Sequence, residues 1–133
     1  MKRYALMALT LCWLATPAFG ISEFSKQWKD KYLGEDVSED YVKTARRAGC
    51  YVCHVKRHPD KKEARNEYGE ALHEYLDKED YPKERIKAEP EAVKKEILAA
   101  FEKAGKKKSE SGETFAEKIK AEELPAVDWE YEE

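Results

Sequence analysis

The segment GCYVCH, residues 49–54, constrains this chain more than any other stretch, because it groups two thiols and an imidazole on neighbouring residues. Cys50 and Cys53 are three positions apart, and His54 follows the second cysteine directly. Four kinds of chemistry use such a Cys-x-x-Cys pair: covalent haem attachment, a zinc site, a redox-active dithiol and a structural disulfide. The rest of the sequence has to distinguish between them.

The first twenty residues have the layout of a secretory signal peptide. Lys2 and Arg3 form a short positive region, an apolar run follows, and small residues around Ala18 and Gly20 suit a cleavage site. The run is shorter than the ~20 apolar residues that cross a bilayer, so no membrane span is expected after cleavage. We therefore predict a signal peptide over residues 1–20 and a periplasmic or secreted mature protein.

Cleavage would change the residue composition and the net charge of the chain. Cys50 and Cys53 become the only cysteines, and both methionines are lost. The cleaved segment contains Lys2 and Arg3 but no acidic residue, so the formal net charge changes from −3 to −5. Because an acidic protein repels polyanions, neither nucleic acid nor an anionic membrane surface is an expected partner. Because charged residues make up 40% of the chain, the core is thin, and a large apolar cofactor would add much buried surface.

Apolar residues recur at helical spacing along the mature chain, and no stretch alternates as a strand would. Ser38 is the expected N-cap of one helix, and Pro90 and Gly105 are the expected first residue and C-cap of another. The prediction is an all-α domain of about four to five helices over residues 21–125, followed by an acidic tail over 126–133. The expected helices cover residues 22–33, 38–55, 90–104 and 113–123, with a further helix that starts at Glu63 or Asn66 and ends at Asp77. The stripe of the helix after Pro90 is Val93, Ile97, Ala100, Phe101 and Ala104.

Export favours haem attachment among the four alternatives. Two cysteines three residues apart on one helical turn can bond the two vinyl groups of one porphyrin edge, while the imidazole of the histidine that follows binds the iron. A thioredoxin-like dithiol would stand at the end of a strand, and a disulfide closing so short a loop would stabilise little. A zinc site would need Cys50, Cys53, His58 and His73 at an unusual spacing. These three remain the alternatives to haem.

The chain resembles a small monohaem c-type cytochrome, in which an all-helical domain carries a CYVCH-like motif near its front. The segment CHVKRHPDKKEARNEYG, residues 53–69, is also similar to a C-H-V…R-N-x-Y/F-G pattern of a group of secreted haem proteins. Together the two motifs cover about a fifth of the mature chain. The resemblance implies a cytochrome c-like fold around one haem c, attached through Cys50 and Cys53, with His54 as the proximal iron ligand.

Electron-carrying cytochromes of this type place a methionine on the sixth iron position, and the mature chain has none. Histidine, one of many lysines, another weak ligand, water or nothing remains for that position. His73 is a candidate distal ligand, although helical spacing places it on a charged face, where it would be an ordinary surface residue. His58 lies only one turn from His54 and is expected in the turn with Pro59 rather than on the iron.

The segment RNEYG, residues 65–69, has two interpretations. Arg65 could pair with a haem propionate, and Tyr68 could pack on the porphyrin. Alternatively, Asn66 caps a helix and Tyr68 is its first core residue. Other aromatic residues at helical spacing are core candidates that could also form the haem pocket: Trp28, Tyr41 and Phe101.

One-electron transfer is the function that these features favour, with no catalytic residue expected. The mature charge of −5, with about −2 more from two ionised propionates, predicts redox partners that carry basic patches. The alternative is a five-coordinate or weakly ligated haem protein that binds or senses a diatomic gas, which the lack of a methionine ligand leaves open. A peroxidase-like enzyme would need a distal acid–base group, and none is evident.

Overall fold

The structure is a computed structural model that describes residues 20–56, 58–60 and 63–126. The predicted signal peptide up to residue 19 and the predicted tail from residue 127 lie outside the described residues. Among the described helices, none combines the length and the apolar character that a membrane crossing requires.

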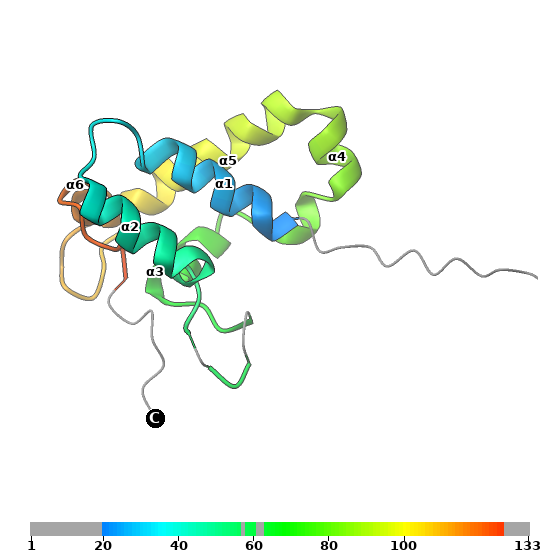
Figure 1. Ribbon diagram of the computed structural model, residues 1–133. Helices are drawn as coiled ribbons and strands as arrows, with labels where there is room; N and C mark the ends of the chain where they lie inside the picture. Colours follow the sequence, from blue (N-terminus) through cyan, green and yellow to red (C-terminus); the bar gives the residue numbers. More distant parts are fainter. Residues whose placement is uncertain (1–19, 57, 61–62, 127–133) are drawn as a thin grey trace, which may run out of the picture.

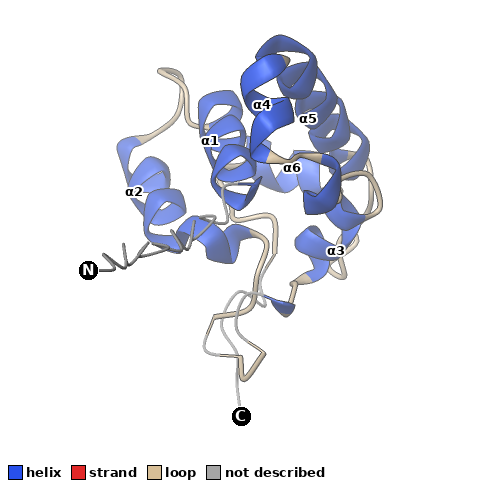
Figure 2. Cartoon of the chain, turned by 90° about the vertical axis from the view of Figure 1, so that its right-hand side faces the viewer, coloured by secondary structure: helices blue, strands red, loops and turns tan. Residues whose placement is uncertain are grey.

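Helices and loops make up all of the described chain, which contains no strand (Figure 2). The all-α prediction is confirmed at this level, with six α-helices rather than four to five. They are α1 (Gly20–Tyr32), α2 (Glu39–Ala48), α3 (Glu67–His73), α4 (Lys83–Ala88), α5 (Pro90–Gly105) and α6 (Phe115–Lys120). Two short 3-10 helices matter for the site, η1 (Gly49–Val52) and η3 (Lys78–Asp80).

Helix α5 is the central element, because it packs against α1, α3, α4 and α6. In Figure 1 α1 lies alongside α5, with α4 and α6 towards the two ends of α5. The predicted stripe of α5 is confirmed, since all of its members are buried: Val93, Ile97, Ala100, Phe101 and Ala104. The shorter helices therefore pack against one long amphipathic helix that begins at Pro90.

Helix α2 is shorter than expected. Ser38 caps it as predicted, with its Oγ accepting a hydrogen bond from the N–H of Tyr41 at 3.3 Å. The helix ends at Ala48 because Gly49 has a φ of 56°, a left-handed conformation that glycine adopts without strain. The prediction that a continuous helix carries the Cys-x-x-Cys-His segment is therefore wrong, and the segment lies on η1 and the loop that follows.

Helix α3 begins after Asn66, as the capping interpretation predicted, but it ends at His73. Tyr75, which was expected in its apolar stripe, is 39% exposed. Helix α4 was not predicted, because its six residues, bounded by Pro82 and Pro90, are too few and too polar for a recognisable periodicity.

The C-terminal segment is bound to the start of α2. The hydroxyl of Tyr41 donates to the carbonyl of Glu123 at 3.1 Å, and the N–H of Ser38 donates to Glu122 Oε1 at 2.9 Å. The Ser38 hydroxyl donates to the other carboxylate oxygen of Glu122. These bonds offset the strain of Glu122, whose φ is 60°. Ala126, where the tail was predicted to begin, is buried in the core at 2% exposure.

Candidate functional site

A tight turn after α2 brings the thiols and the imidazole of the motif together. The N–H groups of Cys53 and His54 both donate to the carbonyl of Cys50, at 3.3 and 3.2 Å. The chain then pairs with a later segment. The N–H of Asn66 donates to the carbonyl of Cys53 at 2.9 Å, and His54 forms an antiparallel bridge with Arg65. Both cysteines are free thiols in this arrangement.

The ring of His54 is oriented by a backbone carbonyl. Its Nδ1 lies 3.1 Å from the carbonyl oxygen of Ala64, which also accepts the N–H of Val55 at 3.1 Å. A carbonyl can only accept, so the proton of the neutral ring resides on Nδ1 and the lone pair on Nε2. Histidines that bind metals are commonly oriented by such a donation from their other ring nitrogen. His54 therefore has the tautomer that an iron ligand needs.

Asn66 joins the turn to α3. Its Nδ2 donates to the carbonyls of Val52 and Tyr51 at 3.0 and 3.3 Å, and its Oδ1 accepts from the N–H of Gly69 at 2.9 Å. The residue is 1% exposed, so water does not compete for these bonds. One side chain thus caps α3 and fixes the backbone between the two cysteines.

Gly69 lets α3 approach the motif closely. A Cβ at this position would lie 2.0 Å from the carbonyl oxygen of Cys53 and 2.9 Å from its carbonyl carbon, closer than real contacts allow. The approach of α3 to the motif therefore depends on the missing side chain rather than on an unusual backbone angle.

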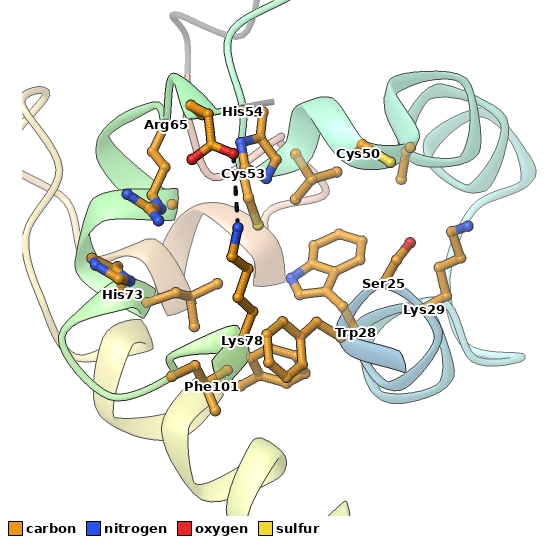
Figure 3. A pocket seen from close by; sticks show the side chains of 18 residues that line it. Ser25, Trp28, Lys29, Cys50, Cys53, His54, Arg65, His73, Lys78 and Phe101 are labelled. Atoms are coloured by element: carbon orange, nitrogen blue, oxygen red, sulfur yellow. Dashed lines mark ion pairs between the residues drawn. The ribbon is translucent and has the colours of Figure 1, made fainter. Parts of the chain in front are cut away.

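An open pocket of about 130 Å³ lies beside the turn (Figure 3). Cys50, Cys53 and His54 all contribute to its lining. Its apolar surface comes from side chains distant in sequence: Phe24, Trp28, Val52, Leu72, Leu76 and Phe101. Its charged and polar lining includes Lys29, Glu63, Arg65, His73 and Lys78. The motif thus opens onto a cavity whose lining is both apolar and charged.

Burial disfavours ionisation of the Cys53 thiol. Burial raises the pKa of the Cys53 thiol to about 12, and the nearby Cys50 acts in the same direction. At neutral pH Cys53 is therefore a neutral thiol and not an activated nucleophile. Among the residues described, no three histidine, cysteine or acidic side chains are grouped so that they could hold a metal ion.

Tyr68 lies behind the pocket rather than in its lining. It is fully buried, and its Oη accepts a hydrogen bond from Trp28 Nε1 at 3.1 Å. Its ring packs edge-on against Phe115, with centroids 5.2 Å apart, and burial raises the pKa of the phenol well above its ordinary value. Tyr68 therefore positions Trp28, which does line the pocket. Of the other aromatic candidates, Phe101 lines the pocket, and Tyr41 is buried outside the lining.

Arg65 and His73, the two other residues singled out from the sequence, both contribute to the pocket lining. Arg65 Nη1 lies 4.0 Å from Glu70 Oε1. His73 is exposed at the end of α3, which agrees with its place on a charged face. His58 lies outside the lining, and its Nδ1 accepts the N–H of Asp60 at 3.1 Å, as expected for a residue in a turn.

Glu63 and Lys78 were not anticipated in the site. They line the pocket and form an ion pair with Nζ and Oε1 3.7 Å apart. The sequence around them is rich in charged residues, so nothing in its pattern separates these two from their neighbours. Only the fold, which returns the chain at η3 to the pocket, identifies them.

A scan against protein-family models finds none that matches this chain, and searches of curated proteins and of solved structures find no match either. The chemistry of the site therefore has to be judged from its own residues.

Proposed function

We propose that this chain is a monohaem c-type cytochrome that transfers single electrons in the periplasm or outside the cell. The observation that carries the proposal is the position of Cys50, Cys53 and His54 together on an apolar pocket, with the imidazole oriented by the carbonyl of Ala64. The two thiols would hold the haem through thioether bonds to its vinyl groups, and His54 would bind its iron through Nε2. The haem would supply the reversible one-electron chemistry of its iron.

The donor set suits this group. Thioether formation uses thiols three residues apart, and the turn holds both thiols on the same pocket. The apolar side chains of the lining suit a porphyrin, whose burial would add to a thin core.

Each part of the pocket would have a separate task. The Ala64 carbonyl would fix the orientation of His54 and raise its basicity, which lowers the reduction potential of a bound iron. Trp28, held by its bond to Tyr68, would exclude water from one side of the cavity. Arg65 would pair with a propionate, since it lines the pocket and its ion pair with the exposed carboxylate of Glu70, at 4.0 Å, is long.

The charge of the protein suits transient docking. A mature chain at −5, with about −2 more from two propionates, would attract a redox partner with a basic patch and release it quickly. Weak electrostatic encounters of this kind are typical of electron carriers.

The test is expression with haem-attachment machinery and purification of the exported protein under denaturing conditions. Covalent haem should remain in the wild type and be lost in the Cys50→Ala/Cys53→Ala double variant. His58→Ala is the matched control, because this ring lies outside the pocket lining, and it should keep its haem.

The oxidised and dithionite-reduced spectra then separate the functions. Sharp reduced bands that do not change with carbon monoxide would support electron transfer. A reduced spectrum that shifts with carbon monoxide would replace electron transfer by gas binding. A wild-type protein without covalent haem would refute both, and zinc should then be measured.

A further inference from the structure

A haem held by His54 would leave its second axial position open to another ligand, and the pocket restricts the choice. The chain beyond residue 20 contains no methionine. Among the described residues that line the pocket, nitrogen donors able to bind iron are His73, Lys29 and Lys78. Arg65 also lines it, but a guanidinium keeps its proton and does not bind iron. The question is which of the three donors reaches into the cavity.

Lys78 is the donor that extends across the pocket. Its Nζ lies 3.7 Å from Glu63 Oε1, and Glu63 directly precedes Ala64, whose carbonyl holds the His54 ring at 3.1 Å. The amine therefore reaches from η3 to the segment that positions the proximal histidine. Figure 3 shows the Lys78 side chain pointing into the middle of the cavity, towards the wall that carries Cys53 and His54.

The backbone of Lys78 is firmly placed. Asp77 Oδ1 accepts the N–H of Glu79 at 3.0 Å and so caps η3. Leu76 on one side and Tyr81 on the other are buried, at 6% and 5% exposure. The ring of Tyr81 packs edge-on against Phe24 of the pocket lining, with centroids 5.4 Å apart. The backbone from which the Lys78 side chain extends is thus held in place beside the pocket lining.

The two competing donors are placed less well. His73 is the last residue of α3, and in Figure 3 its ring lies at the edge of the cavity, beside Arg65. The amine of Lys29 points away from the cavity in the same view. The bond that Lys78 would give up is weak, because an exposed ion pair contributes only about 0–1 kcal/mol.

We propose that Lys78 supplies the second axial ligand of the haem iron through its neutral Nζ, after the ammonium has released one proton to solvent. The inference rests on the proposed function, because it presupposes a haem bound through Cys50, Cys53 and His54. A strong-field amine opposite an imidazole makes the iron six-coordinate and low-spin. Such an iron has no open position for a gas, which fits an electron carrier.

The test compares Lys78→Ala and Lys78→Arg with the wild type in optical and electron paramagnetic resonance spectra, with haem content measured on each sample. Arginine keeps the length and charge but cannot bind iron, so it separates ligation from pairing with a propionate. The wild type should be low-spin, and both variants should lose the low-spin spectrum and bind carbon monoxide when reduced. The controls His73→Ala and Lys29→Ala should remain low-spin.

Four results would overturn the inference. A low-spin Lys78→Arg variant with full haem content would show that the lysine acts through charge alone. Loss of the low-spin spectrum in His73→Ala would assign the ligand to that histidine. A high-spin wild type with covalent haem would show that no side chain binds. A wild type without covalent haem would overturn the proposed function as well, and haem content therefore distinguishes the two failures.

Discussion

Replacement of Asn66 by alanine is the most informative single change in this structure. It removes two donated hydrogen bonds, to the carbonyls of Val52 at 3.0 Å and Tyr51 at 3.3 Å, and one accepted from the N–H of Gly69 at 2.9 Å. At 1% exposure, the site gives the abandoned groups little access to water.

The expected cost follows from these three bonds. Loss of an N-cap costs about 1 kcal/mol, and a buried polar group left without its partner costs about 1–3 kcal/mol. The bond to Tyr51 is long, so most of the loss comes from Val52 and Gly69. We expect Asn66→Ala to lower the free energy of unfolding by about 3 kcal/mol, a large part of the ~5–15 kcal/mol typical of a domain.

Urea unfolding of the purified protein measures this loss, together with the yield of covalent haem. Thr114→Ala is the matched control, because Thr114 caps α6 in an exposed capping box, and its loss should cost only about 1 kcal/mol. Asn66→Asp keeps an acceptor for Gly69 but turns a negative charge towards two carbonyls, so it should be as damaging as alanine. Two results would refute the reasoning: an alanine variant no less stable than Thr114→Ala, or an aspartate variant as stable as the wild type.

Three further changes test separate parts of the structure. Gly69→Ala places a Cβ 2.0 Å from a backbone oxygen and should cost about 3 kcal/mol in urea unfolding, whereas Gly34→Ala, with nothing within 4 Å, should be nearly neutral. Trp28→Phe removes the hydrogen bond to the buried Tyr68 hydroxyl and should lower the free energy of unfolding by about 1–2 kcal/mol. An unchanged urea midpoint would contradict the role given to this bond. Glu122 accepts hydrogen bonds from Ser38 at the start of α2, and these bonds lower the pKa of its carboxyl group below the ordinary value of 4.5. The bonds therefore stabilise the fold fully above pH 4.5, and this stabilisation is lost as the pH falls through the pKa of Glu122 in the folded protein. Glu122→Gln should therefore be less stable than the wild type at pH 7 and equal to it in strong acid; a difference that persists in acid would refute this assignment.

Local signals predicted much of the fold. The buried stripe of α5 was correct because sixteen residues are long enough for a clear 3.6-residue period. Ser38 and Asn66 were recognised as caps because capping depends on residues only three positions away. Helix α4 is too short for such a period, and the end of α2 depended on the single φ of Gly49.

The pocket could not be predicted in the same way, because it depends on contacts between distant segments. The bond between Trp28 and Tyr68 joins residues 40 positions apart, and that pairing made Tyr68 a support for the lining rather than part of it. The ion pair of Glu63 with Lys78 exists only because η3 returns to the cavity. Periodicity placed His73 on a charged face but could not show that this face borders the pocket.

The segment RNEYG is best understood as the structural complement of the Cys-x-x-Cys-His turn. Arg65 pairs with the backbone of His54, Asn66 holds the carbonyls between the cysteines, and Gly69 admits the carbonyl of Cys53. Tyr68 acts one step further away, through Trp28. The two segments together therefore fix the backbone around both thiols and the imidazole before any cofactor is considered. This gives a physical reason for the two motifs to occur together, because neither the turn nor α3 would keep its geometry without the other.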